Sequence, residues 1–206
     1  LKYIIYNYII MKTTTKLLPL IIIFSSLFSL QSQNKFSKRK IENLKEEVSQ
    51  LVEDDKKMTQ VMIDKVFSFG ELGFQEFETS KYLGKILEEN GFDVEYQISD
   101  IPTSWLATWS NGEGGPTIAL GSDFDGVPST SQYPGVAYEK PVVEGAPGHG
   151  EGHNIGLPIV ITSAIAIKKI MIENNINGKL VLWPGVAEEI LGAKAWYVRD
   201  LSLIHI

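Results

Sequence analysis

Three side chains that could bind a metal ion lie together in a glycine-rich stretch. His149, Glu151 and His153 are separated by single glycines within residues 145–154, Gly-Ala-Pro-Gly-His-Gly-Glu-Gly-His-Asn. Imidazole and carboxylate groups are ligands for divalent ions such as zinc. A run of glycine and proline predicts a loop, which can close tightly on something small. Taken alone, the motif fits either a metal site or a surface turn whose histidines face water.

Two pairs of carboxylates each follow an apolar run. Asp123 and Asp125 alternate in the sequence, so in an extended backbone they share one face. Glu188 and Glu189 are adjacent, and at the start of a helix they could simply favour its dipole. Together with the glycine-rich stretch, the four carboxylates favour a site for metal-dependent or acid–base chemistry.

The expected elements bring these residues to one edge of a sheet. Apolar periodicity predicts helices at 36–53, 58–69, 77–90, 157–175 and from 188 to 199, and strands at 93–97, 105–110, 117–121 and 179–183. Helices that alternate with buried strands predict a layered α/β fold with a mostly parallel sheet. Ligands of such sheets bind beyond the carboxyl ends of the strands, where both carboxylate pairs stand.

Four segments resemble, in the same order, the aminoacylase/carboxypeptidase family of dinuclear metallohydrolases, peptidase family M twenty. They are Glu-Leu-Gly-Phe-Gln-Glu at 71–76, Ser-Asp-Phe-Asp-Gly-Val-Pro at 122–128, Gly-His-Gly-Glu-Gly-His-Asn at 148–154 and Pro-Gly-Val-Ala-Glu-Glu at 184–189. The nearest branch contains aminobenzoyl-glutamate, hippurate and indole-acetyl-amino-acid hydrolases. The resemblance implies an α/β/α zinc-peptidase-like catalytic domain, of which residues 58–200 form the N-terminal part.

The resemblance also implies a role for each candidate residue. Glu188 is the general base, and Asp125 is a carboxylate that orients a ligand histidine. Glu151, His153 and Glu189 are metal ligands.

Asp123 and His149 are further candidates, as metal ligands or as residues behind them. Asp123 stands where other branches of the family have a metal-binding histidine. Glu151 stands where many relatives have a bridging cysteine and others an aspartate. A carboxylate can also bridge two ions and favours harder metals, so the resemblance implies two divalent ions, zinc first and manganese as the alternative.

The implied activity is hydrolysis of an amide bond in an N-acyl amino acid or small peptide by a metal-activated water. The residues agree with it, because the chain has no Ser-His or Cys-His nucleophile pattern and no phosphate-binding Gly-x-x-x-x-Gly-Lys motif. The alternatives are a non-catalytic metal- or ligand-binding relative of the same fold and a dinuclear aminopeptidase. Glu188 favours an enzyme, because a protein that only binds needs no general base.

The composition and the N-terminal segment indicate which classes of partner are excluded and where the protein is expected to be located. The 206 residues carry a net charge of −6 with no basic stripe, which argues against nucleic acid, and no cysteine, which excludes disulfides and thiolate ligands. Residues 1–10 precede the first methionine and are predicted to be a translated upstream region. Residues 11–33 have the basic start, short apolar run and polar exit of a signal peptide, which predicts export to the periplasm or the medium. Residues 34–57 are an amphipathic helical lead-in.

The family's chains continue well beyond this one, with a later histidine ligand, a lid and dimerisation domain, and a final histidine. We therefore expect an N-terminal fragment that is itself inactive, and the family allows a homodimer through the further domain. His205 is the only later histidine, and it lies in residues 201–206, which read as an adapter-derived or frameshifted tail.

Overall fold

The computed structural model describes residues 36–201. The chain divides into two units, Leu1–Asn43 and Leu44–Ile206, and all the candidate site residues in the described part of the chain lie in the second. The predicted upstream region, the predicted signal peptide and His205 lie outside the described residues.

Three helices form near the positions that apolar spacing predicts. Helix α2 spans Lys38–Asp54 and crosses the boundary between the units, α3 spans Lys56–Phe69, and α4 spans Phe77–Glu89. Helix α3 ends at Gly70, whose φ of 54° is the left-handed cap that glycine adopts without a steric penalty.

The sheet has four strands in the order β1-β2-β4-β3 among the described residues. The strands are β1 (Asp93–Tyr96), β2 (Trp105–Asn111), β3 (Thr117–Asp123) and β4 (Gly178–Gly185). The layered α/β fold is as expected, but only β3 and β4 pair in parallel, whereas β1–β2 and β2–β4 are antiparallel. The short turn after β2 forces β3 to reverse direction, because a parallel return needs a crossover of a dozen or more residues. Helix α5 (His153–Glu173) provides such a crossover between β3 and β4.

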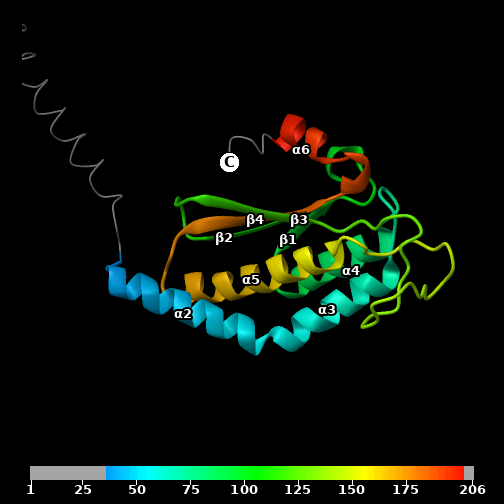
Figure 1. Ribbon diagram of the computed structural model, residues 1–206. Helices are drawn as coiled ribbons and strands as arrows, with labels where there is room; N and C mark the ends of the chain where they lie inside the picture. Colours follow the sequence, from blue (N-terminus) through cyan, green and yellow to red (C-terminus); the bar gives the residue numbers. More distant parts are fainter. Residues whose placement is uncertain (1–35, 202–206) are drawn as a thin grey trace, which may run out of the picture. The chain divides into compact units, whose positions relative to one another are not determined.

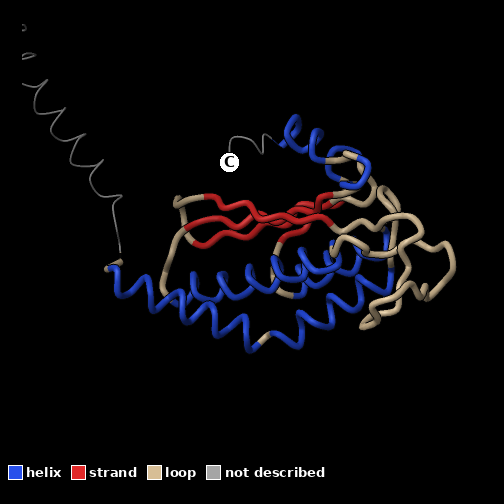
Figure 2. Tube along the Cα trace, in the orientation of Figure 1, coloured by secondary structure: helices blue, strands red, loops and turns tan. Residues whose placement is uncertain are grey.

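Helices α3, α4 and α5 lie on one side of the sheet, and helix α6 (Lys194–Leu201) lies on the other (Figures 1 and 2). The core between the sheet and the three helices is apolar, and Leu157, Ile161 and Leu182 in it are fully buried. On the opposite face the ring of Tyr197 in α6 meets Trp183 of β4 edge-on, with centroids 5.8 Å apart. Both faces of β4 are therefore covered, as the apolar run at 179–183 predicts.

Two helix starts differ from the expectation, and both lie beside the candidate residues. Helix α5 begins at His153 rather than Leu157, because Gly152 turns the chain with a φ of 95°. The helix expected from Glu188 is interrupted. Glu188–Ile190 form a single 3-10 turn, Leu191 has a left-handed φ of 56°, and α6 begins only at Lys194.

Helix α5 is long and apolar enough to cross a membrane by composition alone. In the fold it packs against α3 and β3, and 44% of its most apolar window is buried. It is the central helix of the core, and its length and apolarity follow from burial on several sides.

Candidate metal centre

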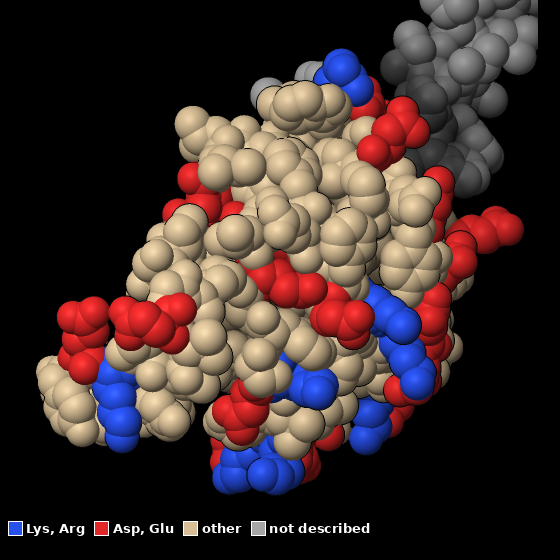
Figure 3. Space-filling view, turned by 90° about the vertical axis from the view of Figure 1, so that its right-hand side faces the viewer, with Lys and Arg blue, Asp and Glu red and all other residues tan. Residues whose placement is uncertain are grey.

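The candidate residues meet where β3 and β4 end and α5 begins. Asp123 is the last residue of β3, and it pairs in register with Gly185 at the end of β4. Because the two strands are parallel neighbours, their carboxyl ends lie at the same edge of the sheet. Figure 3 looks onto the right-hand side of Figure 1 and shows acidic side chains in the middle of that face, among uncharged residues.

Glu151, His153 and Glu189 come together although Glu189 is far from the other two in the sequence. His153 Nδ1 lies 3.3 Å from a carboxylate oxygen of Glu151 and 3.8 Å from one of Glu189. One ligand atom from each of the three residues lies within 4.8 Å of the others, which is close enough to share a single ion. The convergence is thus present, while the role of each residue as a ligand stays a prediction.

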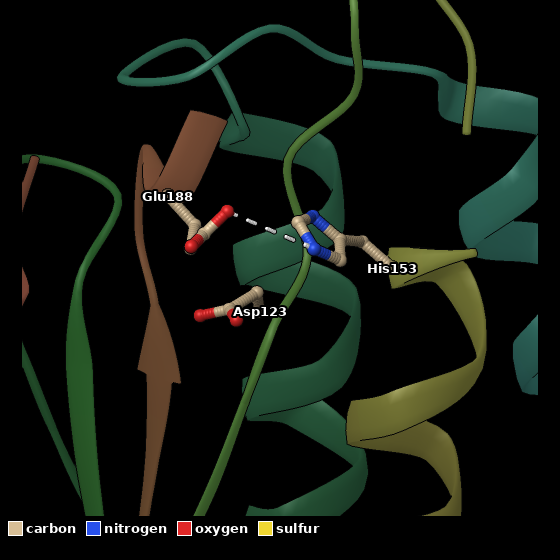
Figure 4. Close-up of side chains that lie close together, drawn as sticks. All are labelled: Asp123, His153 and Glu188. Carbon is tan, nitrogen blue, oxygen red and sulfur yellow. Dashed lines mark ion pairs between the residues drawn. The ribbon is translucent and has the colours of Figure 1, made fainter. Parts of the chain in front are cut away.

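A second group shares His153 and adds Asp123 and Glu188, again with ligand atoms within 4.8 Å of one another. Figure 4 shows the three side chains approaching from the end of β3, the start of α5 and the turn after β4. His153 Nε2 lies 4.0 Å from a Glu188 oxygen. This group already faces a cation, because Lys194 Nζ lies 2.9 Å from Asp123 Oδ1 and 3.7 Å from Glu188 Oε1.

Asp125 stands behind the histidine. Its side chain is fully buried, and its Oδ1 atom lies 3.3 Å from His153 Nδ1 without a hydrogen-bond partner of its own. Its backbone carbonyl lies 3.2 Å from the same nitrogen. Asp125 Oδ2 accepts a hydrogen bond from the N–H of Glu189 at 3.0 Å. It therefore contacts the imidazole and the turn that carries the glutamates, as an orienting carboxylate does.

His149 is a member of neither group, but it lies beside Glu151. Its ring is buried, and Nε2 lies 3.2 Å from the carbonyl oxygen of Val66 in α3. Nδ1 lies 3.8 Å from Glu151 Oε1. Burial lowers the pKa of His149, which favours the neutral ring. The structure therefore puts His149 behind Glu151, where it can orient that carboxylate.

The local electrostatics favour a bound cation. Burial raises the pKa of Glu189, and the negative charge of Glu151 raises it further. Such crowding of carboxylates is unfavourable without a positive charge among them. A histidine and several carboxylates form a donor set that fits a divalent ion such as zinc or manganese. The buried Asp125 Oδ1 has no hydrogen-bond partner among the described residues and lies 3.3 Å from His153 Nδ1, where it can orient the ring. The group of Glu151, His153 and Glu189 fits an ion best, because no lysine ammonium in the described part of the chain contacts its carboxylates, whereas Lys194 contacts those of the other group.

Two residues in the site were not predicted to have a role. Lys194 follows Gly192 and Ala193, and nothing in the sequence there indicates that it pairs with Asp123. Glu76 is fully buried, accepts hydrogen bonds from Thr103 Oγ1 at 2.8 Å and from the N–H of Ala187 at 2.9 Å, and has its pKa raised by that burial. Glu76 belongs to the segment 71–76 that carries the family resemblance, but its place in that segment does not indicate its contacts with Thr103 and Ala187.

The chain is similar in sequence to curated amidohydrolases. It is 30% identical over 153 residues to a subunit of p-aminobenzoyl-glutamate hydrolase of Escherichia coli (strain K12) and 31% identical over 132 residues to hippurate hydrolase of Campylobacter jejuni. These matches cover 74% and 63% of this chain, but 31% and 32% of the relatives. The chain thus spans about a third of the length of the curated relatives it matches. No protein-family model matches the sequence.

Solved structures show the same fold. The YXEP protein of Bacillus subtilis, described as a dinuclear metal binding peptidase from family M twenty, superposes with a TM-score of 0.58 at 24% identity, over 72% of this chain and 41% of that one. A putative aminohydrolase of methicillin-resistant Staphylococcus aureus gives 0.57 at 19% identity, over 68% and 34%. The resemblance predicted from the four segments and the layered α/β catalytic fold are both confirmed.

Proposed function

We propose that the whole protein is a metal-dependent amidohydrolase, on the premise that this chain is homologous to amidohydrolases and has the fold of the M twenty peptidases. The observation that carries the proposal is the approach of Glu151, His153 and Glu189 to within 4.8 Å, with Glu188 directly beside them. The bond attacked is the amide of an N-acyl amino acid or a small peptide, in keeping with the hydrolase names of the relatives.

The donor set can hold one ion through Glu151, His153 and Glu189. Asp123 and Glu188 lie beside it on the side of His153 Nε2. A neutral imidazole has one free lone pair, so His153 serves one of the two groups at a time. A second ion would therefore depend more strongly on carboxylates in this part of the chain. A bound divalent ion would polarise the substrate carbonyl and make the attacking water more acidic.

The protein's own groups do the proton work and the positioning. The carboxylate of Glu188 takes a proton from the attacking water and then delivers it to the nitrogen of the leaving amine. The same group thus acts first as a base and then as an acid. Asp125 oxygens lie 3.2 and 3.3 Å from His153 Nδ1 and can accept its proton. In that tautomer the lone pair of the ring is on Nε2, on the side of Asp123 and Glu188, whereas an ion held through Nδ1 with Glu151 and Glu189 needs the opposite tautomer. Lys194 balances the charge of Asp123. It also lies close to the Glu188 carboxylate, and this attraction keeps the Glu188 side chain near the site.

The test is metal content together with activity. The whole protein, purified with zinc or manganese, is assayed on a panel of N-acyl amino acids and dipeptides. We expect metal-dependent release of an amino acid that stops when a chelator removes the ion and returns when the ion is restored. Absence of bound metal, or hydrolysis that chelation leaves unchanged, would exclude the proposal.

The second candidate is a binding protein of the same fold that does not catalyse. Glu188 counts against it, because its carboxylate lies 4.0 Å from His153 and is not needed for binding through Glu151 and Glu189. Metal binding with no hydrolysis on the whole panel would favour this candidate instead.

We also propose that the protein is exported. The support is the order of residues from Met11 to Asn34, in which lysines precede a short apolar run and a polar exit. Fractionation of cells that express the tagged protein tests this, and a signal confined to the cytoplasm would contradict it.

A further inference from the structure

The turn from Ala187 to Glu189 carries both glutamates of the site in an unusual backbone conformation. Ala187 has a φ of 52°, in the left-handed region that residues with a Cβ rarely adopt. Such a conformation is strained and persists only where neighbouring groups fix it. Something in the fold must therefore hold this turn.

Two buried carboxyl groups hold it from beneath. Glu76 Oε1 accepts the N–H of Ala187 at 2.9 Å, and Asp125 Oδ2 accepts the N–H of Glu189 at 3.0 Å. Both side chains are fully buried. The residue between the two anchored amides is Glu188, the proposed base.

Glu76 is itself fixed from two sides. Its second oxygen accepts a hydrogen bond from Thr103 Oγ1 at 2.8 Å, so both oxygens are engaged. A buried carboxyl group is costly unless its oxygens are hydrogen-bonded. The two hydrogen bonds of Glu76 join it to Thr103 and to Ala187, which lie far apart in the sequence. The Ala187 N–H belongs to the residue directly before Glu188.

Packing around Ala187 leaves little room for another arrangement. A Cβ at Gly73 would lie 3.0 Å from both Cα and Cβ of Ala187, and one at Gly192 would lie 2.7 Å from that Cβ. Both glycines thus allow the backbone to approach the turn closely. The turn is enclosed by packing and oriented by the two carboxyl groups.

We propose that Glu76 is a positioning residue that, through the amide of Ala187, sets the directions in which Glu188 and Glu189 point. The inference rests on the proposed function, because the directions of the Glu188 and Glu189 side chains matter only if these residues serve as base and ligand. With the turn fixed, the Glu189 carboxylate lies 3.8 Å from His153 Nδ1, while that of Glu188 lies on the Nε2 side of the ring. Adjacent carboxylates can then serve two tasks, one on the ion and one on the water.

The test compares Glu76→Leu with Glu76→Gln in the 206-residue chain. Amide hydrogen exchange, measured residue by residue, reports on the Ala187 and Glu189 N–H groups, and titration with zinc or manganese reports the dissociation constant. We expect Glu76→Leu to lose protection at Ala187 and to weaken metal binding by tenfold or more. Glu76→Gln should keep both, because its amide oxygen can accept the Ala187 N–H while its NH₂ donates to Thr103 Oγ1.

Glu71 provides a matched control. Its carboxylate also accepts two backbone N–H groups, those of Glu78 at 3.0 Å and Thr79 at 2.9 Å, but at the start of α4. Glu71→Leu should lower thermal stability and leave both Ala187 protection and metal affinity unchanged. A purely structural role for Glu76 predicts instead that the two leucine variants behave alike.

A folded Glu76→Leu protein with wild-type protection at Ala187 and metal affinity within twofold of wild type would overturn the inference. If Glu76→Leu fails to fold, Glu76→Asp replaces it, because its carboxyl group is one methylene too short to reach the amide. If the unaltered chain binds no metal, the described residues do not form an ion site by themselves, and the proposed function is then tested on the whole protein. The exchange measurement would still decide whether Glu76 holds the turn.

Discussion

At the scale of single residues, the site depends on two neighbouring glutamates with different surroundings. Glu189 donates its backbone N–H to Asp125, and its pKa is raised by burial and by the charge of the neighbouring Glu151. Glu188 instead faces His153 Nε2 and Lys194. The same side-chain type can therefore serve as a ligand at one position and as a base at the next.

Glu188→Gln and Glu189→Gln should separate these two roles in the whole protein. Glu188→Gln keeps the shape of the side chain but removes the base, so we expect kcat to fall by roughly 10²–10⁴ with metal content unchanged. Glu189→Gln should lower metal occupancy, because a neutral amide is a weaker ligand than a carboxylate. Metal analysis alongside steady-state kinetics provides the measurement. Near-normal kcat in Glu188→Gln with its metal bound would show that another group is the base.

At the scale of elements, the position of His153 depends on how closely α5 approaches β3. Gly156, one turn after His153, faces Ser122 near the end of β3. A Cβ at position 156 would overlap Ser122 Oγ and lie 2.8 Å from Ser122 Cβ. The missing side chain therefore lets the start of α5 lie against the strand that carries Asp123.

Gly156→Ala should consequently destabilise the protein although alanine favours helices. We expect a loss of about 1–3 kcal/mol in the free energy of unfolding, as for other overpacked sites. Gly84→Ala in α4 is the matched control. The three atoms nearest to its Cβ would all belong to the half-exposed Tyr96 side chain, the hydroxyl oxygen at 2.5 Å, and that side chain can move away.

Chemical denaturation of both variants measures the difference. Gly84→Ala should stay within about 1 kcal/mol of wild type, because helix propensity offsets the displacement of the ring. Equal stability of Gly156→Ala and Gly84→Ala would contradict the close contact between α5 and β3.

At the scale of the whole unit from Leu44 onward, the site is open to water. The side chains of Glu188 and Glu189 are 34% and 30% exposed, and that of His153 is 19% exposed. Electrostatic catalysis is weakened where water reaches the reacting groups. The described residues also supply a single histidine to the ion, which leaves few ligands for a second one.

The 206-residue chain on its own should therefore bind metal but catalyse poorly. We expect its turnover of N-acyl amino acids to be indistinguishable from that of its Glu188→Gln variant, because solvent screens the site. The assay is amino-acid release at saturating metal. Substantial metal-dependent turnover that Glu188→Gln abolishes would show that the described residues suffice for catalysis.

The sequence alone determined the α/β class, the approximate limits of most elements and the residues that could do chemistry. This was possible because periodic apolar residues report burial directly, and because glycine stops such as Gly70 act locally. The conjunction of four short segments was also specific enough to indicate the amidohydrolase resemblance, which the relatives confirm. The roles of Glu151, His153 and Glu189 as ligands stay predictions.

Only the tertiary structure decided the features that depend on distant contacts. The antiparallel pairing of β2 with β4 and the interruption of the helix after Glu188 follow from how the chain packs, because local propensity does not encode strand order. The contacts of Glu76 with Ala187 and of Lys194 with Asp123 join residues 111 and 71 positions apart. No periodicity links such residues, so their pairing is visible only once β3, β4 and α5 have brought their ends together.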